Sequence, residues 1–142
     1  MTARNILIAL VLVAFVQVSV FASGLPVGLT ELVHQVEATE FEYPERARDL
    51  RSLKSYIANG DFDMAAHKAG NIIKQQKNLI LAKKNGLPAQ LTELIRAVEA
   101  TESGYPERAR DLRSLKSYIA NGDFDMAAHK AKSIIKQQRN IR

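Results

Sequence analysis

The chain contains no cysteine and no tryptophan, and only 6% of its 142 residues are aromatic. The absence of cysteine excludes disulfide bonds, a thiolate nucleophile, a cysteine-ligated metal site and lipid attachment through a cysteine. Glycine and proline are also scarce, with seven and four residues. No segment alternates apolar and polar residues in the manner of a half-buried strand. The composition therefore excludes collagen-like and low-complexity chains and favours an all-α protein.

The first 24 residues form a segment of their own. Arg4 provides a basic start, residues 6–16 form an unbroken apolar run, and Ala22 and Gly24 follow as small residues. This order is typical of a secretory signal peptide cleaved near Ala22 or Gly24. An uncleaved membrane anchor is the alternative, but a spanning helix needs roughly 20 predominantly apolar residues. We therefore expect a secreted, extracellular protein, or a periplasmic one if the source is bacterial.

After this segment one sequence occurs twice. Residues 25–80 align with residues 87–142 without a gap, and 44 of the 56 aligned positions are identical. Agreement this close indicates an internal tandem duplication. We call residues 25–80 the first copy and residues 87–142 the second copy. The expected organisation is a signal peptide at 1–24, a first helical repeat at 25–80, a linker or helix extension at 81–86 and a second helical repeat at 87–142.

Each copy is expected to fold as a unit like a three-helix bundle. In the first copy, Pro44 suits the first turn of the second helix, and Asn59–Gly60 supplies the left-handed conformation that ends it. Asp61 then caps a third helix, which the apolar residues 79–82 prolong to Asn85–Gly86. The expected core positions are Leu29, Leu32, Val33, Val36, Ala47, Leu50, Leu53, Ile57, Phe62, Ala65, Ala66, Ala69, Ile72 and Ile73.

A unit of about 56 residues lies near the lower limit for independent folding. We therefore expect the two copies to dock on each other, or to pair between chains. The third helix of the first copy, with its apolar extension, is the expected seam.

A repeated methionine and histidine pair is the candidate metal site. Met64 and His67 in the first copy, and Met126 and His129 in the second, are expected to point away from the apolar helix face. A thioether and an imidazole are ligands for a soft ion such as Cu(I). We favour the simpler interpretation, in which Asp63 and His67 form a surface pair and the methionine packs on a neighbour. No metal or other cofactor is assigned.

The second helix of each copy carries a basic face, and an anionic partner such as a membrane surface, a glycan or a nucleic acid would suit it. A solvated face is the preferred interpretation, because acidic residues lie among the basic ones and no aromatic residues are interleaved for base stacking. The sequence thus carries no specific nucleic-acid signal. The candidate residues are Arg46, Arg48 and Arg51, with Arg108, Arg110 and Arg113.

Over four residues, Arg48–Arg51 and Arg110–Arg113 resemble the Arg-x-Leu-Arg host-entry motif of oomycete effectors. The acidic Glu-Glu-Arg that follows in that family is absent, and Leu50 is expected in the helix core. We treat the match as coincidental, although a secreted helical effector fits the general design.

No catalytic motif is present, and the acidic residues are expected at helix starts and on solvated outer faces. His34 is replaced by Arg96 in the second copy, so it is expected to be a surface residue and not a shared catalytic base. Enzyme activity is therefore not expected. Lys83 and Lys84 lie between the copies and are either a dibasic processing site or the last turn of a helix.

The preferred hypothesis is an exported, non-enzymatic helical interaction protein that presents two near-identical binding units to a protein partner, with a homo-oligomer as a further option. The alternative is a cationic, membrane-active antimicrobial-type protein or an effector, released from a precursor at Lys83–Lys84. The acidic first helix of the first copy argues against membrane activity. A carrier with a cavity between the bundles ranks third, because the core side chains are small.

Overall fold

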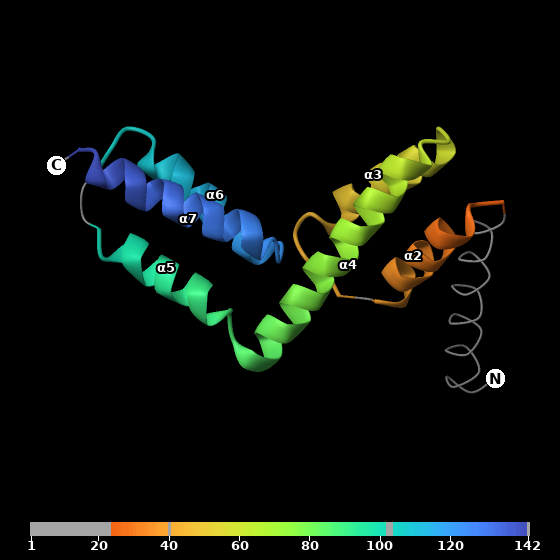
Figure 1. The fold of residues 1–142 in the computed structure, drawn as a ribbon, viewed down its shortest axis with the longest axis horizontal. Coiled ribbons are helices and arrows are strands. Elements are labelled where there is room, and N and C mark those ends of the chain that lie inside the picture. Colours follow the sequence, from red (N-terminus) through yellow and green to blue (C-terminus); the bar gives the residue numbers. More distant parts are fainter. Residues whose placement is uncertain (1–23, 40, 102–103, 142) are drawn as a thin grey trace, which may run out of the picture.

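The computed structural model describes residues 24–39, 41–101 and 104–141, and within these ranges it contains helices and no strands (Figure 1). The expected all-α class is therefore confirmed for the described part of the chain. The predicted signal peptide, apart from Gly24, lies outside these residues. None of the described helices has the length and apolar character needed to cross a membrane.

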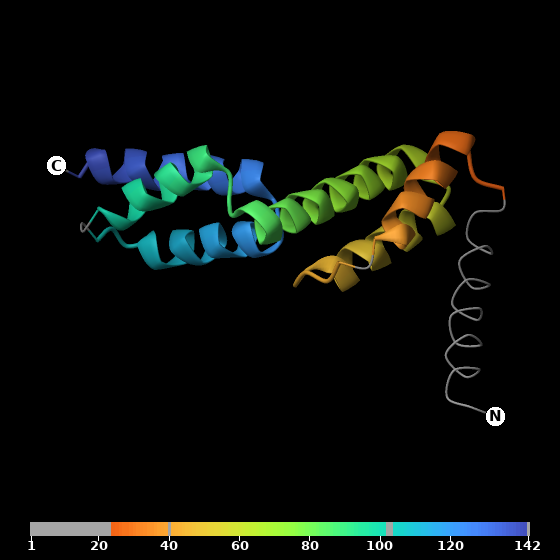
Figure 2. The same ribbon diagram turned by 90° about the horizontal axis from the view of Figure 1, so that it is seen from below.

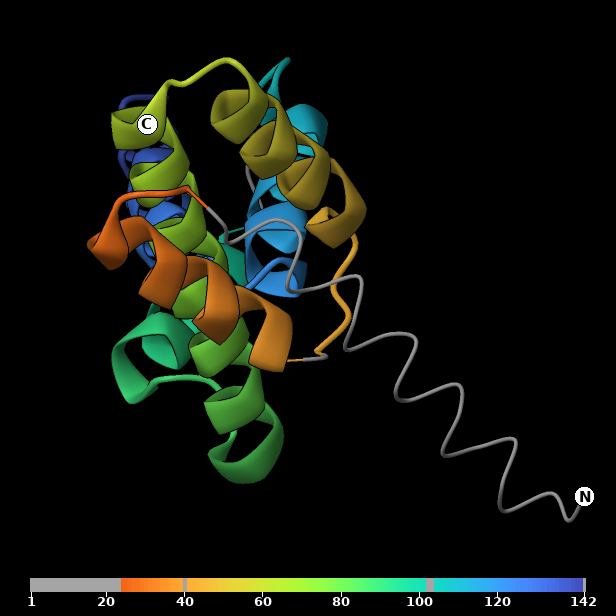
Figure 3. The same cartoon turned by 90° about the vertical axis from the view of Figure 1, so that its right-hand side faces the viewer.

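Each copy contributes three helices. In the first copy, α2 and α3 both pack on α4, and in the second copy α5 and α6 both pack on α7. Figure 3 views the molecule from the end formed by the first copy and shows α2 and α3 against α4. The helices are α2 (Val27–Ala38), α3 (Arg46–Ala58), α4 (Phe62–Asn85), α5 (Ala89–Glu99), α6 (Arg108–Ala120) and α7 (Phe124–Arg139).

The ends of the helices follow the expected local signals. Gly60 ends α3 with a φ of 73°, in the left-handed region that favours glycine. Asp61 begins α4, and its carboxylate accepts a hydrogen bond from the backbone N–H of Met64 at 3.4 Å. As expected, α4 continues through the apolar residues 79–82 to Asn85, and Gly86 follows it.

The core of each copy lies where two helices cross the third. In the first copy, Leu29, Val33 and Val36 of α2 and Leu53 of α3 are buried against the small face of α4. The expectations for Ala47 and Phe62 are wrong, because both residues are exposed. The buried side of α3 is centred on Leu53, and Ala47 lies about 120° from it around the helix.

Asp49 occupies the buried side of α3 instead, and its counterpart Asp111 does the same in α6. Only 7% of Asp49 and 5% of Asp111 are exposed. The expectation that the acidic residues occupy solvated outer faces is therefore wrong for this pair. A charged group is buried only where partners hold it, and each carboxylate has two. Tyr43 donates to Asp49 at 2.9 Å, and Lys68 lies 3.1 Å from it.

The two copies form two arms joined by the connection between α4 and α5 (Figure 1). Turned by 90°, the same arms lie one after the other along the longest axis of the molecule (Figure 2). The connection between α6 and α7 points from the second arm toward α4. The two copies meet where this connection contacts α4.

Candidate functional site

The junction between the copies is made by a turn of the second copy and two helices of the first. The side-chain oxygen of Asn121 accepts a hydrogen bond from the backbone N–H of Glu45 at 3.1 Å. The side-chain amide of Asn78 donates to the backbone carbonyl of Gly122 at 2.9 Å. An ion pair between Lys74 of the first copy and Asp125 of the second copy also joins them. The junction thus contains specific polar contacts.

Gly122 brings the turn very close to α4. A Cβ atom at this position would lie 2.5 Å from the backbone carbonyl oxygen of Gln75 and 2.7 Å from Cγ of Leu79. Real Cβ atoms do not approach a backbone atom so closely, so only glycine fits without a shift of the two copies. Its φ of 72° favours glycine as well.

Two surfaces therefore define the junction. We call residues 121–125 of the second copy, and their counterparts 59–63 of the first copy, the docking turn. We call the surface that it contacts the receiving face. In the first copy the receiving face consists of Glu45, Lys74, Gln75, Asn78 and Leu79, and its counterparts in the second copy are Glu107, Lys136, Gln137, Asn140 and Ile141.

The expectation that the third helix of the first copy, with its apolar extension, forms the seam between the copies holds only in part. The helix α4 does carry the junction: its polar contacts come from residues 74–78, and Leu79 and Ala82 of the apolar extension lie against the second copy. Two apolar residues of the extension, Ile80 and Leu81, remain exposed. The docking turn lies against Gln75 and Leu79, and the side-chain amide of Asn78 donates to the backbone carbonyl of Gly122 between them.

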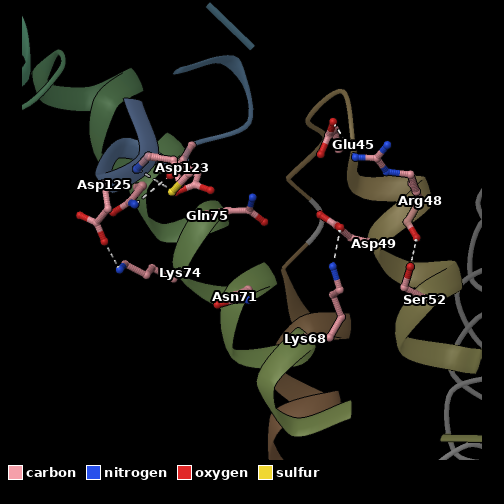
Figure 4. Close-up of a pocket in the computed structure, with 13 residues that line it drawn as sticks. Glu45, Arg48, Asp49, Ser52, Lys68, Asn71, Lys74, Gln75, Asp123 and Asp125 are labelled. Carbon is pink, nitrogen blue, oxygen red and sulfur yellow. Dashed lines mark hydrogen bonds and ion pairs between the residues drawn. The ribbon is translucent and has the colours of Figure 1, made fainter. Parts of the chain in front are cut away.

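Beside the contacts the junction leaves a cleft of about 480 Å³ between α3, α4 and the start of α7. Its walls carry both signs of charge, and Figure 4 shows the acidic and basic side chains facing one another. Each basic residue of the lining has an acidic partner. The pairs are Arg48 with Glu45, Lys68 with Asp49, and Lys74 with Asp125.

Burial and polar contacts shift the pKa of Lys74 in the cleft and of residues in the tyrosine–aspartate contacts of both copies. The hydrogen bond from Tyr105 at 2.8 Å holds the pKa of the Asp111 carboxyl below its usual value, and Lys130 acts in the same direction. Burial and this hydrogen bond raise the pKa of Tyr105 to about 12. Burial raises the pKa of Tyr43 in the same way. The hydrogen bond to Asp125 raises the pKa of Lys74.

This arrangement suits binding of a polar protein surface. The three basic residues of the cleft are paired with three of its four acidic residues, and the fourth, Asp123, caps α7. The pair of Lys74 and Asp125 joins the two copies. No group of three or more histidine, aspartate or glutamate residues in the described ranges could hold a metal.

The methionine and histidine pairs lie on the surface. Met64 and Met126 are exposed to the same extent, and both histidines are exposed. The His67 imidazole lies 3.4 Å from the side-chain amide of Asn71, one turn further along α4. Met126 lines the cleft at the junction. The first pair therefore belongs to the surface of its own copy, whereas Met126 of the second pair lies beside the junction between the copies.

The basic residues of the second helices divide into two groups. Arg46 donates to the carbonyl of Thr39 at 2.9 Å, and Arg108 donates to that of Thr101 at 2.7 Å, so both tie the first helix of a copy to the second. The other four are exposed, and two of them pair with an acidic neighbour three residues earlier. These four are Arg48, Arg51, Arg110 and Arg113.

The remaining candidate residues, Lys83, Lys84 and His34, are exposed on helices of the first copy and its extension. Lys83 and Lys84 are exposed in the last turn of α4, where a cation interacts favourably with the helix dipole. His34 is exposed on α2.

The residues of the junction escaped the sequence analysis. Asn59 and Gly60 are predicted only to end a helix, and no prediction is made for their counterparts Asn121 and Gly122. No sequence signal distinguishes the two pairs, because the stretch that contains them is identical in the two copies.

Comparisons with protein-family models, with curated proteins and with solved structures find no match for this chain.

Proposed function

We propose that the chain is an exported, non-enzymatic binding protein in which a duplicated three-helix unit follows a cleaved signal peptide. Export rests on the sequence of the first 24 residues. The duplication is supported by the identical residues at an offset of 62 positions, and the bounds of α3 and α6 recur at the same offset.

One observation carries the binding proposal. In the first copy, the receiving face holds a protein segment, the docking turn of the second copy, through two hydrogen bonds and an ion pair. In the second copy, the counterparts Lys136, Gln137, Asn140 and Ile141 are exposed. The same surface thus occurs once occupied and once open, and the open one is the proposed binding site for a protein partner.

Affinity capture from the extracellular fluid of the source tests this proposal. The bait is the exported form, residues 25–142, and the variant is Lys136→Asp, which reverses the charge at the centre of the open face. The control is Lys116→Asp, because Lys116 is exposed on α6 and the change of charge is the same. A partner retained by the control and lost with Lys136→Asp supports the proposal. A partner that both variants retain equally, or no partner at all, contradicts it.

The intact mass of the secreted product tests export and processing. A single species that contains both copies and lacks residues 1–22 or 1–24 is the expected result. Two species divided near Lys83–Lys84 would identify a precursor instead. In that case, dye release from anionic vesicles would decide whether the separate copies are membrane-active.

A further inference from the structure

We propose that molecules of this protein assemble head to tail, with the first-copy docking turn of one molecule bound to the second-copy receiving face of the next. The inference rests on the proposed function, since it names a second copy of this chain as the occupant of the open face. It follows from a junction that each molecule already contains once.

The first-copy docking turn is exposed but has the conformation of the bound one. Asn59 has φ and ψ of −85° and −3°, and Asn121 has −89° and 0°. The following glycines have φ of 73° and 72°. The free turn therefore needs no rearrangement to dock, which removes one cost of association.

The first-copy docking turn lacks the contacts that bury the second-copy docking turn. Asn121 is 4% exposed, whereas Asn59 is exposed. A Cβ atom on Gly60 would meet no atom within 4 Å, whereas on Gly122 it would overlap the receiving face. The space filled by α4 at the second-copy turn is thus empty at the first-copy turn.

The open receiving face offers the groups that the turn needs. Four of its five residues are identical to those of the occupied face, and the fifth replaces Leu79 by Ile141. Glu107 has an N-cap backbone with φ and ψ of −94° and −1°, as Glu45 has. Asn140 follows α7 with near-helical φ and ψ of −79° and −9°, so its side chain leaves the backbone much as that of Asn78 leaves α4.

The position of the two free surfaces determines the kind of assembly. The connection between α3 and α4 lies at one end of the molecule, and the end of α7 lies at the other (Figures 1 and 2). One molecule therefore cannot join its own free surfaces, and a second molecule must supply the partner. A contact between two different surfaces is heterologous, and its repetition gives rings or open fibres.

The contact between molecules is expected to be weak. Within one chain, the connection between the copies acts as a tether with an effective concentration on the order of millimolar. Between molecules no tether acts, and exposed ion pairs add only about 0–1 kcal/mol each. Association is therefore expected to depend on concentration over the range from about 10 µM to about 1 mM.

Sedimentation velocity of the exported form over that range tests the proposal. The weight-average sedimentation coefficient of the wild type should rise with concentration, whereas Gly60→Asn should remain monomeric, because its Cβ would overlap the carbonyl of Gln137. Gly28→Asn is the control, since Gly28 is exposed on α2 with open space around it and its counterpart in the second copy is the polar residue Gln90. It should associate like the wild type. A monomeric wild type, or a Gly60→Asn variant that associates equally, overturns the proposal.

Zero-length carbodiimide cross-linking provides a second readout. In a mixture of isotopically labelled and unlabelled protein, Lys136 should join an aspartate of the docking-turn sequence of the other isotope. Asp63→Asn should abolish this mixed cross-link, which identifies Asp63 although the segments around Asp63 and Asp125 are identical. The pair of Lys74 and Asp125 within one molecule serves as the internal positive control. Association without the mixed Lys136 cross-link would mean that another surface carries it and would overturn the head-to-tail arrangement.

The two proposals fail separately. A monomeric protein that still captures a different partner through Lys136 would support the proposed function and contradict the proposed self-assembly. Concentration-dependent assembly that Gly60→Asn abolishes would support the self-assembly even if no other partner were found.

Discussion

The side-chain oxygen of Asn121 accepts a hydrogen bond from the backbone N–H of Glu45 at 3.1 Å, although 76 positions separate the two residues. Its counterpart Asn59 has the same local conformation and lies exposed. Two asparagines in identical sequence surroundings therefore differ in their contacts, because only Asn121 lies at the junction between the copies. The repeated sequence thus supplies an internal control for each residue of the junction except Leu79, whose counterpart is Ile141.

The first prediction compares these two asparagines. Asn121→Ala should lower the free energy of unfolding by about 0.5–1.5 kcal/mol, the net value of one hydrogen bond. Asn59→Ala should change it by less than about 0.5 kcal/mol, as is usual for an exposed position. Urea denaturation measures both variants. Equal losses would mean that the Asn121 contact adds nothing to stability.

The second prediction concerns the glycines that follow. Both have positive φ, so Gly60→Ala and Gly122→Ala should each cost about 1–2 kcal/mol in backbone strain. Gly122→Ala should cost about 1–3 kcal/mol more, because its Cβ overlaps the carbonyl of Gln75. Denaturant unfolding again gives the comparison. A Gly122→Ala variant no less stable than Gly60→Ala would show that the copies do not pack at this point.

The third prediction is a dependence of stability on acid. The pKa of Asp111 is lowered in the folded state, first by the hydrogen bond from Tyr105. A lowered pKa stabilises the fold above the unfolded pKa of about 3.9 and ceases to do so as the pH falls through the folded value. Asp111→Asn should therefore be less stable than the wild type at pH 7, and the difference should shrink below about pH 4.

Chemical denaturation of the wild type and of Asp111→Asn between neutral and acid pH checks this. Glu93→Gln is the control, because Glu93 is exposed on α5. A difference between the wild type and Asp111→Asn that stays constant with pH would disprove the role of the charged carboxylate.

The fourth prediction concerns alkali. Burial and the hydrogen bond to Asp111 raise the pKa of Tyr105 to about 12, whereas an unfolded tyrosine titrates near about 10. The folded state then holds its proton longer, so the contribution is complete below about pH 10 and is lost as the pH rises through about 12. Stability should fall over this interval, and less steeply in Tyr105→Phe.

The absorbance of tyrosinate measures the same group directly. Subtracting the titration of Tyr105→Phe from that of the wild type should leave one group with a pKa well above that of exposed tyrosine. A group that titrates near about 10 would mean that the hydroxyl is free of Asp111.

Most of the helices could be predicted because their signals are local. The glycines at positions 60 and 122 end helices through their own φ, and the aspartates that follow cap the next helices through their own side chains. Predictions that needed distant partners were less successful. Asp49 is buried because Tyr43 and Lys68 meet it, and Lys68 comes from another helix 19 positions away. Helical spacing alone placed Ala47 in the core, where it does not lie.

The sequence by itself determined the all-α class and the helix ends of the described chain, because these depend on neighbours within a few residues. It also carries the repeat and the pattern from which export is proposed. Only the tertiary structure decided which copy of each surface is occupied. Residues 59–63 and 121–125 are identical, so no local rule can distinguish them. The difference arises because the connection after α4 brings the second turn onto the first receiving face and leaves the first turn and the second face exposed.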